Sequence, residues 1–261
     1  MTLPAMPKIE LSSLTMAFGG NQALRGIDMR VEAGKSTVLI GPSGAGKTVL
    51  MKCVLGLLRP DAGKVLIDGV DTTLLSGAAQ TEFLHRFGML FQRGGLFDSL
   101  PVWENIAFRL LYEKGMSRTR ARDIAIEKLA LVGLAEATGD LLPGEISGGM
   151  QKRVGLARAI ATDPEILLLD EPTAGLDPVM TNVISGLINR MVKNLGATAL
   201  CVTSDMDGAR AIAHSIAMIH DGCILWQGPA ANADNSGNAY VDQFIHSRAD
   251  GPIRMRLAIG D

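Results

Sequence analysis

Gly41-Pro42-Ser43-Gly44-Ala45-Gly46-Lys47-Thr48 is the stretch that decides the fold of this chain. The apolar run 36–40 precedes it and the run 49–52 follows it, which predicts a buried strand, a glycine-rich loop and a helix start. A glycine, four free positions and then Gly-Lys-Thr is the spacing of a phosphate-binding loop, whose backbone N–H groups converge on one anion. We therefore expect a nucleoside triphosphate site, with Lys47 on the β- and γ-phosphates and the Thr48 hydroxyl on Mg²⁺.

Composition limits the class of protein. The 261 residues are 47% hydrophobic and 20% charged, which suits a packed globular core. A net charge of −2 gives no support for a nucleic-acid-binding surface, so we expect no nucleic acid partner. No uncharged run approaches the roughly 18 residues that span a bilayer, and the first residues lack the apolar stretch of a secretory signal. We expect a soluble, cytoplasmic chain that reaches a membrane only through partner subunits.

The cysteines and histidines predict neither disulfides nor a metal site. Cys53, Cys201 and Cys223 lie far apart in apolar sequence, so we expect buried free thiols. The four histidines form no cluster of ligands.

Apolar patterns elsewhere predict an α/β chain with an inserted group of helices. Strand-like runs occupy residues 9–11, 26–31, 64–69, 88–91, 166–170 and 199–203, and helical patterns cover 102–114, 117–132, a segment from 147–151 to 161, and 179–195. We expect a helical lobe over residues 95–160 inserted into a core of residues 1–94 and 161–228. Residues 229–261 then form a less regular C-terminal extension.

Asp170 and Glu171 close the apolar run 166–169. In parallel α/β sheets, ligands bind at the carboxyl ends of the strands. Asp170 is suited to hold Mg²⁺ through its water shell, and Glu171 could accept a proton from the water that attacks a γ-phosphate. An Asp-Glu pair alone is more often a solvated loop start, but beside a phosphate loop it predicts catalysis.

Ser147-Gly148-Gly149-Met150-Gln151 is a second candidate anion site. Its two glycines expose backbone N–H groups at a helix start. One chain has no use for two phosphate clamps so far apart, whereas two copies arranged head to tail would use both. The alternative for this segment alone is a glycine-rich helix start that serves only as a cap.

Over nearly its whole length the chain resembles the ATP-binding subunits of ABC transporters. Residues 41–48 look like the Walker A loop, 166–171 like the Walker B strand with its catalytic glutamate, 147–151 like the signature motif, and 174–177 like the D-loop. The resemblance implies an α/β fold: a P-loop NTPase (RecA-like) core, an antiparallel β-subdomain and an inserted α-helical subdomain. It also implies ATP and Mg²⁺ as ligands.

The same resemblance assigns further residues to the site. Gln92 falls where the family keeps a glutamine that senses Mg²⁺ and relays to the transmembrane partner. Phe18 lies where an aromatic ring stacks on adenine, although a core phenylalanine is an alternative. Ser147, Gly148, Gly149 and Gln151 of the signature and Asp177 of the D-loop are expected to contact nucleotide at the interface of two copies.

Ser204 departs from the family pattern. The family usually reads Thr-His-Asp at this point, and here the segment is Thr203-Ser204-Asp205, so Ser204 replaces the switch histidine. A serine hydroxyl is too short to make the imidazole contact with the γ-phosphate, so either hydrolysis is slow or a water or another residue substitutes. His214 is a poor stand-in. We expect a working but altered ATPase, with a regulatory ATP-binding subunit as the alternative.

Finer resemblance points to the branch that energises MCE-protein lipid transporters, which include the Mla systems. Residues 92–108, Met150 in the signature and residues 244–253 carry it. It implies an ATPase homodimer at the cytoplasmic face of the inner membrane, bound to permease subunits and an MCE-domain substrate-binding protein. It also implies that the tail reaches the other ATPase copy, with Phe244, Ile253 and Leu257 as apolar contacts.

Two other classes stay open. An ATPase for another ABC importer, such as one for amino acids or metal ions, would carry the same core motifs. A soluble ABC protein of DNA repair or translation would need long coiled-coil arms or two fused ATPase halves, and this sequence has neither.

Overall fold

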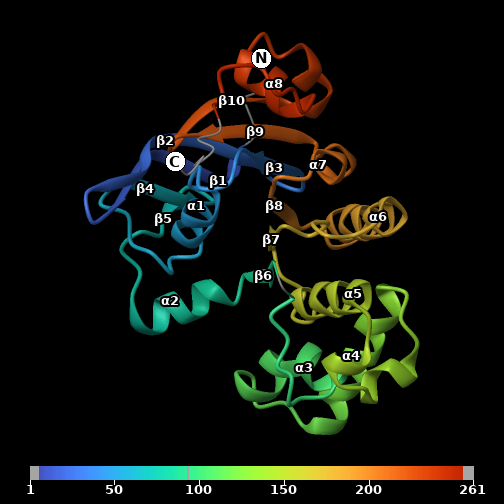
Figure 1. Cartoon of the computed structure of the whole chain (residues 1–261). Helices are drawn as coiled ribbons and strands as arrows, with labels where there is room; N and C mark the ends of the chain where they lie inside the picture. The colour runs from blue at the N-terminus through green and yellow to red at the C-terminus, as the bar shows by residue number, and fades with distance from the viewer. Residues whose placement is uncertain (1–5, 93, 255–261) are drawn as a thin grey trace.

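Residues 6–92 and 94–254 are described by the computed structural model, which contains two sheets and a separate group of helices (Figure 1). The first sheet is antiparallel, in the order β2-β1-β4-β5. Its strands are β1 (Pro7–Phe18), β2 (Asn21–Glu32), β4 (Ala62–Ile67) and β5 (Val70–Asp71). The first two extend well beyond the predicted runs 9–11 and 26–31, and Asp68-Gly69 joins β4 to β5.

The second sheet carries the phosphate-loop segment. Its order is β10-β9-β3-β8-β7-β6, and all neighbouring pairs are parallel except β10 with β9. The strands are β3 (Ser36–Ile40), β6 (Phe87–Leu90), β7 (Ile166–Asp170), β8 (Thr198–Thr203), β9 (Ser215–His220) and β10 (Cys223–Pro229). The strands predicted at 36–40 and 166–170 are confirmed.

Continuous apolar runs arise here because both faces of the parallel strands are buried. Leu39 and Leu168 face a core shared with the first sheet and with α1 (Lys47–Val54). Val38 and Leu169 face a second core that includes residues of the helical lobe. Successive side chains of one strand therefore serve two different cores.

Three helices form a lobe beside the β6–β7 edge (Figure 1). They are α3 (Val102–Tyr112), α4 (Arg118–Leu131) and α5 (Gly148–Ala159), with the short 3₁₀ turns η1 (Glu136–Asp140) and η2 (Pro143–Glu145) between α4 and α5. Helix α6 (Pro178–Leu195) follows β7 and packs in the core that α5 also lines. These four helices lie within a few residues of their predicted ranges.

The structure adds elements that the sequence patterns did not predict. They are α2 (Gly77–Leu84), α7 (Met206–Ile212), β10, η3 (Ala230–Asn235) and α8 (Ala239–Ile245). In the tail, Phe244 and Ile253 pack against the core of their own chain, and Leu257 lies outside the described residues. Cys53 and Cys201 are buried as expected, whereas Cys223 is only half-buried. In residues 6–92 and 94–254, no helix has both the length and the apolar character required to cross a bilayer.

Candidate active site

Four strand ends converge on one cavity of about 330 Å³, here called the strand-end cavity. The phosphate loop follows β3, Gln92 follows β6, Asp170 ends β7 and Ser204 follows β8. Because these four strands are parallel neighbours, their carboxyl ends share one edge of the sheet. The cavity is lined by Ala23, Ser43, Gly44, Gly46, Lys47, Thr48, Val49, Gln92, Asp170, Glu171, Val202 and Ser204.

Two positions of the phosphate loop require glycine. Gly41 and Gly46 have φ angles of +153° and +107°, which L side chains rarely adopt. A Cβ atom at Gly41 would collide with the Ile219 carbonyl oxygen, and one at Gly46 with the Ala23 carbonyl oxygen. The loop is therefore seated directly on β9 and β2, with α1 beginning immediately after it.

Lys47 is a buried cation at the start of α1. Its side-chain Nζ donates to the carbonyl oxygens of Gly41 at 2.6 Å and Pro42 at 3.0 Å. Burial lowers the pKa of Lys47, and the nearby carboxylates of Glu171 and Asp170 act in the opposite direction. The lysine thus lies among acceptors of its own chain in a place where a phosphate would supply stronger ones.

The oxygen atoms needed for Mg²⁺ are available in the cavity. Burial and the Glu171 charge raise the pKa of Asp170, with Lys47 opposing them. Within the described part of the chain, no hydrogen bond reaches the Asp170 carboxylate, the Thr48 hydroxyl or the Gln92 side chain. Carboxylate, hydroxyl and amide oxygens are the hard donors that Mg²⁺ prefers, and a cation would relieve the raised pKa of Asp170. The residues present therefore fit the ion.

Glu171 is held by β8 through both its side chain and its backbone. Thr203 Oγ1 donates to Glu171 Oε2 at 2.8 Å, and the Ser204 backbone N–H and hydroxyl donate to Oε1 at 3.0 and 3.1 Å. Glu171 has a φ angle of +47°, a left-handed conformation that disfavours L residues by roughly 1–2 kcal/mol. Its backbone N–H donates to the Val202 carbonyl oxygen at 2.8 Å. Three donors thus fix the candidate general base as an acceptor.

Sequence reasoning missed the part that Thr203 takes in this arrangement. The only signal was a hydroxyl residue at the end of an otherwise apolar strand, beside Ser204. The Ser204 hydroxyl donates to the Glu171 carboxylate. The comparison with the family histidine did not predict this contact. His214 bonds to Ser36 at the opposite end of β3, about 13 Å along the strand from the loop, and takes no part in the cavity.

The signature segment lies apart from this cavity. Ser147 caps α5, its Oγ accepting from the Met150 N–H at 3.3 Å, and Gly148 is exposed beside it. Gln151 Nε2 donates to the Pro143 carbonyl oxygen at 2.9 Å. Among the described residues, none of 147–151 lines the strand-end cavity. One chain therefore does not bring its two candidate phosphate clamps together.

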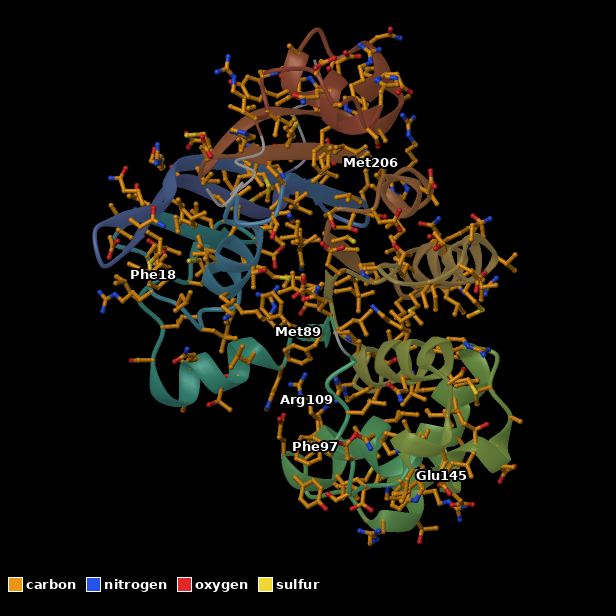
Figure 2. All side chains as sticks on the ribbon, in the orientation of Figure 1. Phe18, Met89, Phe97, Arg109, Glu145 and Met206 are labelled. Atoms are coloured by element: carbon orange, nitrogen blue, oxygen red, sulfur yellow. The ribbon has the colours of Figure 1, made fainter. Side chains whose placement is uncertain are left out.

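Phe18 and Asp177 also lie outside the lining of the cavity. Phe18 ends β1 with 46% of its surface exposed, on the β-rich part of the chain (Figure 2). Asp177 is the N-cap of α6, and its Oδ1 accepts from the N–H groups of Val179 at 2.9 Å and Met180 at 3.0 Å. Their predicted contacts with nucleotide remain predictions.

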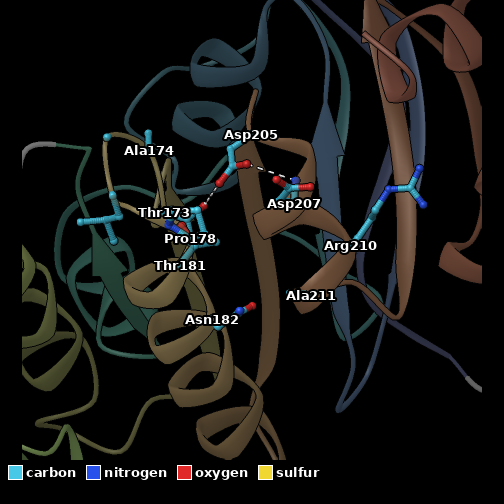
Figure 3. Close-up of a pocket in the computed structure, with 11 residues that line it drawn as sticks. Thr173, Ala174, Pro178, Thr181, Asn182, Asp205, Asp207, Arg210 and Ala211 are labelled. Carbon is cyan, nitrogen blue, oxygen red and sulfur yellow. Dashed lines mark hydrogen bonds between the residues drawn. The ribbon is translucent and has the colours of Figure 1, made fainter.

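A larger cavity of about 560 Å³ lies between the 173–178 loop, α6 and α7 (Figure 3). Thr173 Oγ1 donates to Asp205 Oδ2 at 2.5 Å across its wall. Arg210, on its rim, is already paired with both carboxylate oxygens of Asp234, at 2.8 and 2.6 Å. This cavity shares no lining residue with the strand-end cavity and holds no phosphate loop, so its size does not make it the nucleotide site.

Comparisons with known proteins agree on one family. A model of the ABC transporter family matches residues 24–174. The chain is 42% identical over 254 residues to the probable ribonucleotide transport ATP-binding protein mkl of Mycobacterium tuberculosis, covering 97% of this chain and 70% of that protein. It is 37% identical over 253 residues to the intermembrane phospholipid transport system ATP-binding protein MlaF of Haemophilus influenzae, covering 97% and 96%.

Solved structures give the same result. The dimeric post-hydrolysis state of the ATP-binding cassette MJ0796, bound to ADP and Pi, superposes with a TM-score of 0.78 at 30% identity, over 85% of this chain and 98% of that chain. The structure of cbiO1 from Clostridium perfringens, part of the ABC transporter complex cbiONQ, superposes with a TM-score of 0.80 at 27% identity, over 93% and 96%.

Proposed function

Because this chain belongs to the ABC transporter family, as an ATP-binding and ATP-hydrolysing subunit, we propose that it drives phospholipid transport through a membrane permease. The observation that carries the chemistry is the convergence of Lys47, Asp170 and Glu171 on one cavity at the carboxyl edge of the sheet. The lipid cargo rests on the relationship to MlaF, a protein named for phospholipid transport.

Each residue of the cavity has a definite task in this proposal. Thr48, Asp170 and Gln92 would hold Mg²⁺, which would supply positive charge next to the phosphates of ATP. Lys47 exchanges its carbonyl acceptors for phosphate oxygens, and the N–H groups of the loop and of the α1 N-terminus bind the same anion. Glu171 accepts the proton of the attacking water on its carboxylate.

Thr203 and Ser204 orient the base for that proton transfer. Their three donors occupy both oxygens of Glu171 and hold the carboxylate at the carboxyl end of β8. These bonds limit rotation of the carboxylate, so its position relative to the attacking water is fixed before the proton moves. Ser204 therefore contributes to hydrolysis by orienting Glu171, and it does not make the contact with the γ-phosphate that a histidine would make.

A homodimer completes the site. Ser147 and Gly148 are exposed and do not line the cavity of their own chain, so the N–H groups of this turn are available to a second copy. We infer that each signature closes on the nucleotide held by the other copy, with Asp177 and Gln151 near the seam and Phe18 against the adenine. The dimeric form of the MJ0796 cassette supports this arrangement.

A groove of about 450 Å³, here called the aromatic groove, is the proposed seat of the permease. Met89 of β6, Phe97 before α3 and Arg109 on α3 are among the residues that line it (Figure 2). Phe91 and Phe97 are 45% and 44% exposed, and Phe97 stacks on Phe108 with ring centroids 4.5 Å apart. Because β6 and α3 both contribute walls, movement of the lobe against the core would push on a helix seated there.

The assembly implied by these contacts has further parts. Permease subunits would place the chain peripherally at the cytoplasmic face of the inner membrane, and an MCE-domain protein would carry the lipid. The domain division into a core of 1–94 and 161–228, a lobe of 95–160 and an extension of 229–261 belongs to the same proposal.

The decisive experiment identifies partners and cargo together. The native complex is purified through this chain, its subunits and bound lipids are identified by mass spectrometry, and it is reconstituted in vesicles that contain fluorescent phospholipid. We expect Mg-ATP to drive phospholipid transfer in the wild type and not in a Lys47→Ala complex.

A different cargo would overturn the lipid proposal. The name of mkl refers to ribonucleotide transport, so radiolabelled ribonucleotides form the second arm of the experiment. ATP-driven uptake of ribonucleotide without lipid transfer would refute phospholipid transport and leave the ATPase intact. A complex that binds ATP but does not hydrolyse it would instead support a regulatory subunit.

A further inference from the structure

Lys152 is a buried lysine that contacts two catalytic segments at once. It lies on α5, five residues after the Ser147 cap, and is 9% exposed. Its Nζ donates to the Gln92 carbonyl oxygen at 3.0 Å and to the Glu171 carbonyl oxygen at 2.7 Å. The two acceptors follow β6 and β7, whereas the lysine belongs to the helix that begins at the signature.

The setting of Lys152 makes this contact structurally significant. Burying an ammonium group is unfavourable unless it is hydrogen-bonded, and bonds from a charged donor are stronger than neutral ones. Burial lowers the pKa of Lys152, while the Glu171 and Asp170 charges act in the opposite direction. The lysine reaches Glu171 through the backbone, because the hydrogen bonds to the carboxylate of Glu171 come from Thr203 and Ser204.

The Glu171 peptide depends on partners from two elements. Its left-handed backbone directs the N–H to the Val202 carbonyl oxygen on β8 and the carbonyl oxygen to Lys152 on α5. The same carbonyl oxygen also accepts from the Ala174 N–H at a longer distance, 3.4 Å. Loss of Lys152 would therefore remove the shorter, charged hydrogen bond to this carbonyl and leave a disfavoured conformation less firmly held.

A second cation on α5 holds the same loop. Arg158 donates to the carbonyl oxygens of Gly95 at 2.7 Å and Gly94 at 2.6 Å. The loop after β6 is therefore attached to α5 at two points, and of these two cations only Lys152 also reaches Glu171.

We propose that Lys152 is a positioning residue that couples the signature helix to the backbones of Gln92 and Glu171 in the same chain. The inference rests on the proposed dimer, in which the signature of one copy contacts the nucleotide of the other. Displacement of α5 on nucleotide contact then moves the Lys152 ammonium group and both carbonyl groups with it. Engagement at one site of the dimer is transmitted to the general base at the second site.

A matched pair of lysine substitutions tests this coupling. Lys152→Met keeps the chain length and removes the donor. Lys128→Met is the control, because Lys128 is also a buried lobe lysine, with its Nζ 2.6 Å from Asp163 Oδ1 and, within residues 6–92 and 94–254, no hydrogen bond to a motif residue. We expect kcat for ATP to fall at least tenfold in Lys152→Met with the ATP dissociation constant within twofold of wild type. Lys128→Met should lower the unfolding temperature and leave kcat within twofold.

Hydrogen exchange supplies a readout that does not require turnover. Peptides that cover 88–96 and 170–174 should exchange faster in Lys152→Met and at the wild-type rate in Lys128→Met. Lys152→Arg, which keeps the charge and the donors, should restore kcat to within about threefold of wild type. If Lys152→Met does not fold, Lys152→Gln takes its place under the same criteria.

The outcomes separate this inference from the proposed function. Equal kcat values in Lys152→Met and Lys128→Met, or unchanged exchange at both peptides, would overturn the coupling. A loss of ATP affinity as large as the loss of kcat would also overturn it, because the lysine would then serve nucleotide binding. A wild-type complex that moves no phospholipid refutes only the cargo proposal, since the exchange measurement stands apart from transport.

Discussion

The two edges of the parallel sheet carry the same kinds of charged side chain and use them in opposite ways. At the carboxyl edge, Asp170 has a pKa raised by burial and accepts no hydrogen bond from a described residue. At the amino edge, Glu165 lies 2.6 Å from Lys8 Nζ and 2.7 Å from Arg86 Nη2, which hold the pKa of that carboxyl at about 2. At the amino edge the carboxylate is paired with cations of the same chain, and at the carboxyl edge the Asp170 carboxylate is left for a ligand.

Lys47→Ala is expected to have the largest effect on the carboxyl edge. It removes the only described lysine that lines the strand-end cavity. Loss of one preorganised donor to the charge that develops in the transition state lowers kcat by about 10²–10³-fold. We therefore expect kcat for ATP to fall about 10³-fold. Phosphate release measures it. Lys52→Ala is the matched control, because Lys52 is exposed on the same helix and should change kcat less than twofold. Retained hydrolysis in Lys47→Ala would remove the phosphate loop from the mechanism.

Gly148→Asp tests whether a second copy completes this edge. A Cβ atom at Gly148 meets nothing within 4 Å, so the side chain fits, and a carboxylate in the first turn of α5 stabilises the helix. The new charge would repel a phosphate group, so we expect hydrolysis to fall about 100-fold while ATP binding by the isolated chain is unchanged. Gly148→Ala should stay within about threefold. Full activity of Gly148→Asp would show that the signature does not meet nucleotide.

Ser204→Ala removes one of the three donors that hold the general base. The backbone N–H of residue 204 and the Thr203 hydroxyl remain, so the carboxylate is loosened and not released. A hydrogen bond to a charged group is worth about 1.5–3 kcal/mol, and we expect kcat to fall about tenfold with little change in KM. Ser204→Thr keeps the hydroxyl and should recover most of the rate. An unchanged kcat in Ser204→Ala would mean that the hydroxyl does not orient Glu171.

Much of the carboxyl edge could be predicted from local sequence. The run 36–40, the glycine spacing of 41–48 and the run 166–170 each encode their own structure, because burial on both strand faces demands continuous apolar residues. The N-cap at Ser147 and the Pro178 start of α6 are equally local. These short-range rules place the nucleotide residues without knowledge of the tertiary structure.

The unpredicted features depend on partners distant in the chain. Lys152 reaches main-chain carbonyl groups 60 and 19 residues away, and any residue type offers a carbonyl, so no sequence pattern marks the contact. Helix α2 begins at Gly77 and buries only Phe83 among its residues, so it shows no apolar period. The start of helix α8 is marked in the sequence by Asn238, whose side chain accepts from the N–H groups of Tyr240 and Val241 as an N-cap. The helix has only seven residues, too few to show a clear apolar period.

Glu165→Gln probes the amino edge and should have the smallest effect. The depressed pKa of Glu165 arises first from Arg86 and then from Lys8. Its stabilising contribution is therefore fully present above the unfolded pKa of about 4.3 and is lost as the pH falls toward about 2. Because the Glu165 side chain is 51% exposed, solvent screening limits the loss in Glu165→Gln to less than about 1 kcal/mol at pH 7.

Urea unfolding at pH 7 and at lower pH measures this contribution, and the difference from wild type should shrink as both proteins are acidified. ATP turnover by the folded variant at pH 7 should match wild type, because the cluster lies at the opposite ends of β6 and β7 from Gln92 and Asp170. A Glu165→Gln protein that keeps its stability and loses turnover would contradict the assignment of stability to the amino edge and of catalysis to the carboxyl edge. Charge pairs at the amino edge would then act on the strand-end cavity through the length of the sheet.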